Sequence, residues 1–477
     1  MKYKIITVIA MLLILAQPSG LFSAGLGAGA SSSGVKHLAM KLPEYEEAVL
    51  DNGLRIFIIE TEEVSLVSFR LLIPNGSAAE PAGQGGLASI TASLCMKGAA
   101  GMSAEEISEA VEGIGGELDV GATHDYTVFT GSFISRDLSA GLDLLAKVVL
   151  SPDFSEDEIE REKRIVEASI QGIKEDPYDL ASREFHRILG CGHPYGEPQD
   201  GTLESVSGIT RKEVKKFYVR NYRPNGAIMA IVGDVNTERA LRAVMKSFEG
   251  WERGPEGAAK VESLEMGRCP GRKVVVIDKP GATQSQIRIG NISAGRNTPD
   301  FFPLVVANGV LGGGFTSRLM DEIRVNRGLS YGARSRLSQY RSGGFFGVVT
   351  FTKNETLRET IDVAFAELEK IRDTEVGEEE LRKSEKYISG LFPFELETNS
   401  DLARWMTNLA FYGLTPDFIE GYRERVSVVS SEDVQRVARK YFWVEDCRIL
   451  VLTDYEKTKD QIEGLGPVTV VKVDEVE

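Results

Sequence analysis

Two segments in the first third of the chain alternate between apolar and polar residues, as half-buried strands do. They cover residues 54–60 and 65–73, and a further pair of strands is expected within residues 117–134. Capping boxes at residues 103–106 and 155–158 precede runs with apolar residues at helical spacing, so helices are predicted to begin there. This order predicts a unit in which helices lie between pairs of strands.

The segments that end the first and the second half of the chain resemble each other. Residues 210–222 predict a helix and residues 227–232 the strand that closes the first half. Residues 431–441 and 448–452 repeat that order about 220 positions later, each time with a Thr or Ser cap, a Tyr late in the helix and an apolar strand. We therefore expect an internal duplication.

The intervening residues supply the rest of the second copy. Strands are predicted at 272–277, at 284–292 and within 329–350, helices at 300–311 and 316–324, and two long helices after them. The expected fold class is α+β, with two similar domains, each an antiparallel sheet with helices packed on one face. The expected boundaries are 40–250 for the first domain, 251–270 for a polar linker, 271–460 for the second domain and 461–477 for a tail.

The first thirty residues have the order of a secretory signal peptide. Two lysines precede the apolar run 5–16, and small residues follow, with cleavage expected after Ala24 or Ala30. The alternative, a membrane anchor, is disfavoured because the run is shorter than the ~20 residues that a span needs. We expect an exported protein, periplasmic or otherwise extracytoplasmic, with no membrane span after cleavage.

Charge and cysteine content narrow the possible partners. A net charge of −16 disfavours nucleic acid. The four cysteines, Cys95, Cys191, Cys269 and Cys447, form no C-x-x-C pair, and an oxidising compartment would permit three disulfide pairings among them. Cys95 lies on the apolar face of a predicted helix and is expected to be a buried thiol.

The segment GQGGLASITASLCMKGA, residues 83–99, has the frame of a zinc-peptidase helix. It resembles the insulinase/pitrilysin family of zinc metallopeptidases, in its bacterial and mitochondrial-processing-peptidase-like branch. Active members carry H-x-x-E-H there, because two imidazoles one turn apart bind zinc and the Glu acts as general base. Here Ser89 and Ser93 stand at the His positions and Ala92 at the Glu position.

The resemblance also places the family's third zinc ligand. It falls on Ser169 in a later helix, with Glu162 and Glu167 nearby as the alternatives if the alignment slips. One carboxylate without imidazoles is a poor zinc site, so we expect this chain to bind no metal.

The four histidines offer no replacement. His37, His124, His186 and His193 form no local pair at ligand spacing. His124 lies where the family aligns substrate, but a half-exposed strand residue is the favoured interpretation over a metal ligand.

Residues 311–332, LGGGFTSRLMDEIRVNRGLSYG, match the family's C-terminal signature. The resemblance assigns Arg324 to the substrate carbonyl and Tyr331 to the oxyanion of the tetrahedral intermediate. Taken alone, Arg324 is a solvated helix charge and Tyr331 a strand residue. The glycines at 312–314 lack the Lys of a phosphate-binding loop, so a tight helix entry is expected there.

The segment 115–129 corresponds to the family's strand that lines the chamber and pairs with substrate. Asp119 and Val120 stand here in place of the family's Asn-Ala.

These features predict a non-catalytic subunit of an exported zinc metallopeptidase complex. Its partner would carry zinc and an intact H-x-x-E-H, while this chain would supply Arg324 and Tyr331 to unfolded peptide substrates. The alternative is a peptide-binding or assembly protein without proteolytic activity.

Overall fold

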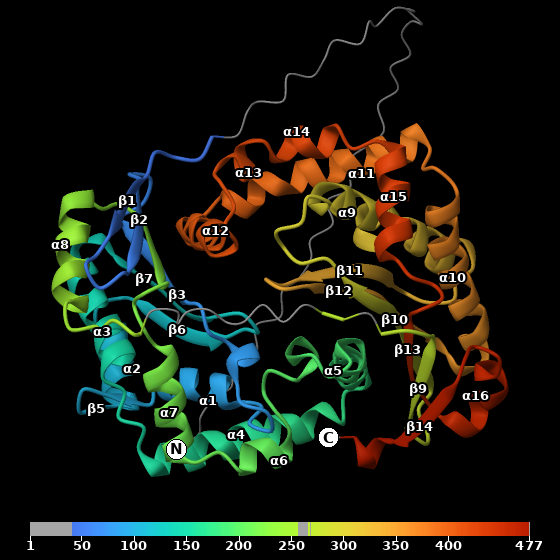
Figure 1. Ribbon diagram of the computed structural model, residues 1–477, viewed down its shortest axis with the longest axis horizontal. Coiled ribbons are helices and arrows are strands. Elements are labelled where there is room, and N and C mark those ends of the chain that lie inside the picture. The colour runs from blue at the N-terminus through green and yellow to red at the C-terminus, as the bar shows by residue number, and fades with distance from the viewer. Residues whose placement is uncertain (1–40, 256–265, 268, 477) are drawn as a thin grey trace, which may run out of the picture. The chain divides into compact units, whose positions relative to one another are not determined.

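Two six-stranded sheets organise the computed structural model, which describes residues 41–255, 266–267 and 269–476 (Figure 1). The first sheet has the order β1-β2-β8-β3-β7-β6 and the second β11-β12-β10-β13-β9-β14. The strands of the first sheet are β1 Glu46–Val49, β2 Arg55–Glu60, β8 Ile228–Gly233, β3 Leu66–Ile73, β7 Thr127–Ile134 and β6 Glu117–Ala122. Those of the second are β11 Ala333–Gln339, β12 Gly344–Lys353, β10 Gln284–Ser293, β13 Arg448–Thr453, β9 Lys273–Asp278 and β14 Val468–Lys472.

The duplication is visible in the strand order. Read from opposite ends, the two sheets place their strands in the same sequence, with β2, β8, β3, β7 and β6 corresponding to β9, β13, β10, β12 and β11. The edge strands differ, because β1 precedes β2 and pairs with it antiparallel, whereas β14 comes at the chain end and pairs with β9 in parallel. The stretch 461–477, expected as a tail, thus contributes a strand.

The α+β fold class is confirmed, but the sheets are mixed rather than wholly antiparallel. The pairs β2–β8 and β9–β13 are parallel, and the connections between their strands run through the whole of each half. Alternation along a strand indicates which side chains share a face and carries no information on the direction of the neighbouring strand. The predicted domain boundaries remain a prediction, and the expected signal peptide and part of the linker lie outside the described residues.

Helices fill the connections as the caps predicted. In the first half they are α1 Leu87–Leu94, α2 Ala104–Gly113, α3 Leu138–Leu150, α4 Glu156–Ile173, α5 Pro177–Gly190, α6 Leu203–Ser207, α7 Arg211–Asn221 and α8 Thr237–Phe248. In the second they are α9 Phe301–Asn308, α10 Leu357–Asp373, α11 Glu378–Leu391, α12 Asn399–Tyr412, α13 Asp417–Glu420, α14 Tyr422–Ser427, α15 Ser431–Tyr441 and α16 Tyr455–Ile462. Ser103 forms a full capping box with Glu106, and the Ser155 side chain accepts from the Glu158 backbone N–H. No described helix is both long and apolar enough to cross a bilayer.

Helices cover both faces of each sheet, not one face as expected. The helix on the second face comes from the opposite half: α12 packs on β3 and β8 of the first sheet, and α5 packs on β10 and β13 of the second (Figure 1). Every residue of β8 and of β13 is consequently buried. Because the covering helix lies far away in sequence, no local pattern of residues predicts that the second face is covered.

Phe185 anchors the contact between α5 and the second sheet. Its side chain is buried against two glycines, Gly290 on β10 and Gly347 on β12, which face each other in the strand register. A Cβ added at Gly290 would lie 2.9 Å from the ring, and one at Gly347 would lie 2.8 Å from it. The paired glycines leave the space that the ring occupies.

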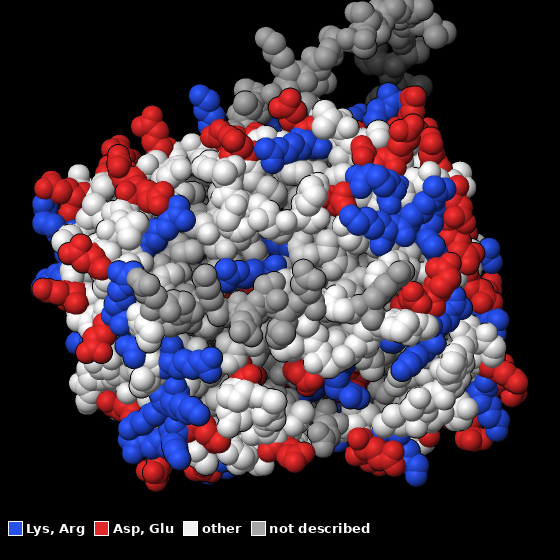
Figure 2. Space-filling model, in the orientation of Figure 1, with Lys and Arg blue, Asp and Glu red and all other residues white. Residues whose placement is uncertain are grey.

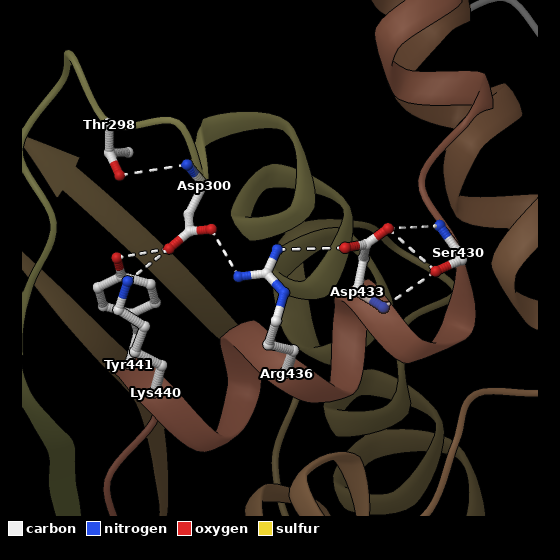
Figure 3. Close-up of polar contacts among 7 residues, drawn as sticks. All are labelled: Thr298, Asp300, Ser430, Asp433, Arg436, Lys440 and Tyr441. Carbon is white, nitrogen blue, oxygen red and sulfur yellow. Dashed lines mark hydrogen bonds and ion pairs between the residues drawn. The ribbon is translucent and has the colours of Figure 1, made fainter.

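A buried carboxylate joins the start of α9 to α15 (Figure 3). Asp300 accepts hydrogen bonds from Arg436 at 2.6 Å and from Lys440 and Tyr441 at 2.8 Å each. Burial raises the pKa of the Asp300 carboxyl, but the hydrogen bonds from Lys440, Arg436 and Tyr441 outweigh burial and lower the pKa to about 2. The carboxylate therefore stays ionised and holds the two helices together.

Charged side chains of both signs are interspersed on the face drawn in Figure 2. Of the four cysteines, two form a disulfide and two are free thiols, so none of the three complete pairings is formed. A disulfide joins Cys191, just after α5, to Cys269, just before β9, while Cys95 and Cys447 are buried thiols, as expected for Cys95.

Adding a methyl group at Gly347 should displace the Phe185 ring from its packed position. Gly347→Ala is expected to lower the free energy of unfolding by about 1–3 kcal/mol through overpacking, and Phe185→Ala by about 3–5 kcal/mol through the cavity it leaves. The double variant should lose less than the sum, because the colliding ring is gone. Urea denaturation measures all three, with Gly121→Ala on β6 as control, since an added Cβ there meets nothing. Strict additivity would contradict this packing.

The Asp300 interactions should make stability depend on acid pH. Because the folded pKa lies below the ordinary value, their contribution is complete above about pH 4 and is lost as the pH falls towards about 2. Asp300→Asn should therefore lower the free energy of unfolding by about 2 kcal/mol at pH 7 and by clearly less at pH 3. Asp460→Asn, at an exposed position, is the control for both pH values. An equal loss at the two pH values would exclude the ionised carboxylate as the cause.

Candidate functional site

The residues predicted to stand at the family's zinc-motif positions, Ser89, Ala92 and Ser93, lie on α1, which begins directly after Gly86. Gly86 has a φ of 89°, a conformation that favours glycine, and a Cβ there would lie 2.8 Å from the Asp200 carbonyl oxygen. The N-terminal end of α1 is also bound by the half-buried Glu80, whose carboxyl accepts from the Ala88 backbone N–H at 2.7 Å. Burial raises the pKa of Glu80 to about 8, against the lowering effect of the Ala88 and Gly86 hydrogen bonds.

The segment 199–201 packs closely on this end of α1. The Ser89 hydroxyl donates to the Gln199 carbonyl oxygen at 2.8 Å. Arg183 of α5 holds the same segment by donating to the Asp200 carboxylate and the Gly201 carbonyl. Ser89 thus has a structural partner at the position where active family members place an imidazole.

The other motif positions also lack metal ligands. Ala92 is fully buried, Ser93 is half-buried on the same helix, and Ser169 is exposed on α4, which packs against α1. No cluster of three His, Cys, Asp or Glu residues able to hold a metal occurs in the described part of the chain. Hydroxyl and methyl groups are not the ligands that zinc takes in proteins, so these residues do not fit the metal.

His124 differs from its expected environment. It lies in the turn between β6 and β7, not in a strand, and is 5% exposed rather than half-exposed. Its Nδ1 bonds with the Ser77 hydroxyl at 2.9 Å, and its ring contacts Tyr195 and Tyr340. Burial, with smaller contributions from His186 and His193, lowers the pKa of His124 to about 4. Tyr340 comes from the second half, which is why the first half's sequence did not indicate this burial.

The segment 115–129 contains β6, which forms one edge of the first sheet. Asp119 and Val120 lie on this strand, and α1 packs beside it. An edge strand leaves backbone groups free to pair with an extended peptide. The predicted role in substrate binding remains a prediction.

Arg324 and Tyr331 come together at one open cavity of about 380 Å³. Arg324 belongs to a π-helical turn, Met320–Asn326, and its guanidinium lies 4.8 Å from the centre of the Phe315 ring. Tyr331 is 83% exposed. Within the described residues, neither the Arg324 guanidinium nor the Tyr331 hydroxyl has a hydrogen-bond or ion-pair partner. Two free donors therefore line one cavity.

The sequence singled out the glycines at 312–314, which also line this cavity, but not three of its side chains. Phe315 stacks on Arg324, Arg334 lies on β11, and Tyr387 comes from α11. Phe315 follows directly on the three glycines and could have been found as an apolar residue next to a tight turn. Tyr387 is distant in sequence, and only the packing of α11 brings it here.

Comparison with known proteins identifies the class. The family description "Insulinase (Peptidase family M16)" matches residues 55–201, and "Peptidase M16 inactive domain" matches residues 208–386. The chain belongs to the M16 peptidase family, with both its N-terminal and its C-terminal type of domain.

Relatives extend over most of the chain. An uncharacterized zinc protease of Mycobacterium leprae is 28% identical over 81% of this chain and 86% of its own length. Zinc protease PqqE of Helicobacter pylori is 26% identical over 85% and 92%. The solved M16 inactive domain from Pseudomonas fluorescens has a TM-score of 0.79 at 26% identity, covering 86% of this chain and 98% of its own. A chain of Complex III2 from Candida albicans, with a TM-score of 0.73 at 14% identity over 89% and 100%, shares the fold.

Zinc binding should require more than the three motif residues. The natural chain is expected to hold no stoichiometric zinc. The variant Ser89→His/Ala92→Glu/Ser93→His should bind zinc at least about tenfold more weakly than the same variant with Ser169→Glu, because catalytic zinc needs three protein ligands. Competition with a chelating dye measures the affinity, and circular dichroism checks folding, since Ala92 is buried and Ser89 would lose its bond to Gln199.

Equal affinity of the two variants would mean that an existing carboxylate, Glu162 or Glu167, is the third ligand. Stoichiometric zinc on the natural chain would contradict the prediction outright.

Proposed function

We propose that this chain is the non-catalytic subunit of an exported M16 zinc metallopeptidase complex. It supplies Arg324 and Tyr331 to a partner chain that carries zinc and an intact H-x-x-E-H. The observation that carries the proposal is the contrast between the two parts of the site: Arg324 and Tyr331 line one cavity with free donors, while the motif positions hold no zinc ligand.

The two donors suit acyl-transfer chemistry. The Tyr331 hydroxyl donates a hydrogen bond to the oxyanion that develops at the attacked carbonyl, where donors in a dry site have their largest effect. The Arg324 guanidinium binds a substrate backbone carbonyl and so positions the peptide. Phe315 restricts the guanidinium by stacking on it at 4.8 Å. The edge strand β6 gives an unfolded peptide a backbone to pair with.

Two further observations support the setting of the proposal. The Cys191–Cys269 disulfide is typical of an oxidising compartment and supports an extracytoplasmic location. The likeness to a chain of Complex III2 supports the use of this fold in a multi-chain assembly, although that likeness concerns the fold alone.

Loss of the Tyr331 hydroxyl should lower turnover of the mixed complex. The chain is combined with an M16 chain of the same organism that carries H-x-x-E-H, and hydrolysis of a fluorogenic unfolded peptide is followed. Tyr331→Phe should reduce kcat by about 10²–10³-fold, the effect of removing one oxyanion donor, with assembly intact by gel filtration. Tyr178→Phe, a partly exposed tyrosine outside the cavity, is the control and should leave kcat unchanged.

Arg324→Ala in the same mixture should raise KM more than it lowers kcat, because its carbonyl partner is present in the ground state. Arg327→Ala is the matched control, since Arg327 pairs with Glu322 and Glu359 and lies outside the cavity. An intact complex whose turnover is insensitive to both Tyr331 and Arg324 would reject the subunit role. A peptide-binding or assembly protein would then be the remaining function.

A further inference from the structure

A second cavity, of about 400 Å³, adjoins the one that holds Arg324 and Tyr331. The two share Gly313 and Tyr387 in their linings. The walls of the second cavity are largely aromatic and aliphatic. They include Phe301, Leu337, Ile388, Phe392, Trp405 and Tyr422. A cavity of this size and character is typical of a small-ligand site.

A cation without an anionic partner lies in this apolar lining. The guanidinium of Arg296 is 4.4 Å from the centre of the Phe301 ring, 5.3 Å from that of Phe418 and 5.8 Å from that of Trp405. The Arg296 backbone N–H donates to Tyr340, but its side chain has no hydrogen bond or ion pair with any described residue. Burial lowers the pKa of Arg296, and the nearby Tyr412 and Tyr422 raise it in part. An arginine in a protein nevertheless remains charged.

Other polar atoms of the same lining are also unpaired. The Trp405 indole N–H, the Gln339 amide nitrogen and the Asn308 amide oxygen are buried without a hydrogen-bond partner among the described residues. Buried polar atoms are nearly always paired in native proteins, because an unpaired one costs about 1–3 kcal/mol. These three atoms are closed to solvent, so the polar group of this lining that a ligand can contact is the partly buried Arg296.

The charge of that group follows from the lining. Glu395 is the carboxylate of the cavity, and it is already paired with Arg404 at 2.9 Å. Among the residues that the structure describes, Arg296 therefore has no counter-ion. Its planar guanidinium matches a carboxylate in a two-bond arrangement.

We propose that this cavity binds a carboxylate carried on an apolar stem. Arg296 pairs with the carboxylate, and the aromatic walls contact the stem. On a peptide, the group is either an acidic side chain or the terminal carboxylate. The peptide source rests on the proposed function, through the neighbouring Arg324–Tyr331 cavity, whereas binding itself requires only this chain.

The first test compares an acid with its amide on the full isolated chain. Phenylacetate should bind at least about tenfold more tightly than phenylacetamide, equivalent to ~1.4 kcal/mol. Calorimetry gives the affinity, and tryptophan fluorescence should respond because Trp405 lines the cavity. Equal affinity for the two probes, or no binding of phenylacetate, would overturn the proposal.

Short peptides distinguish the two sources of the carboxylate. Acetyl-Ala-Leu with a free terminus is compared with its amide, and acetyl-Ala-Glu-Ala amide with its Gln counterpart. Tighter binding of the first acid assigns the terminal carboxylate, and tighter binding of the second assigns an acidic side chain. If neither acid exceeds its neutral counterpart, the peptide assignment is wrong.

Variants locate the binding at Arg296. Arg296→Gln should weaken phenylacetate binding at least about tenfold. Arg296→Lys keeps the positive charge but loses the planar two-donor geometry of the guanidinium, so its affinity for phenylacetate should lie between those of the natural chain and Arg296→Gln. Arg425→Gln is the matched control, because Arg425 also stacks on an aromatic ring, Phe302 at 5.6 Å, but lies outside the cavity. Unchanged binding in Arg296→Gln would reject the site, and if that variant does not fold, Arg296→Lys and the acid–amide comparison decide.

The outcomes for the two proposals are separable. Carboxylate binding by the isolated chain, combined with an inactive mixture, would support this site and count against the subunit role. An active mixture, combined with no carboxylate binding by the isolated chain, would support the subunit role and count against this site.

Discussion

The contact between Phe185 and the paired glycines of β10 and β12 shows the constraint on which the rest of the fold depends. Each half covers only one face of its sheet with its own helices, and the other face is partly apolar. The second face of each sheet receives a helix from the other half, α5 in one direction and α12 in the other. Exposing either face would return a large apolar area to water, at roughly 25 cal/mol for each Å². The two halves are therefore interdependent.

The helices of each half also position the residues of the candidate sites. On the first half, α5 carries Arg183, which holds the segment 199–201 over α1, where Ser89 bonds to Gln199. On the second half, α11 brings Tyr387 between two cavities, one with Arg324 and Tyr331 and one with Arg296. In the first half, the predicted zinc-motif position Ser89 is hydrogen-bonded to Gln199. In the second half, Arg324 and Tyr331 have no hydrogen-bond or ion-pair partner among the described residues. This asymmetry within a duplicated fold is the basis of the proposed subunit role.

Much of the architecture could be predicted from the residues. The caps at Ser103 and Ser155 begin helices, and the duplication appears as matching strand orders. The prediction of sheets covered on one face was wrong, because coverage by α5 and α12 is a long-range property. The interpretation of His124 as half-exposed was wrong for the same reason: Tyr340, from the other half, covers it. At the site, the resemblance of residues 311–332 to the family signature indicated Arg324 and Tyr331, but not Tyr387, Phe315 or Arg296.

The sequence by itself determined the family, the duplicated order of strands and helices, and the absence of imidazoles at Ser89 and Ser93, since these depend on residue identity and local spacing. Only the tertiary structure decided which helix covers which sheet, which cysteines pair and which polar groups are left without partners. The physical reason is that pairing and burial are set by neighbours in space. Arg296 is unremarkable in the sequence, and it becomes a candidate binding residue because aromatic rings surround it and no described carboxylate pairs with it.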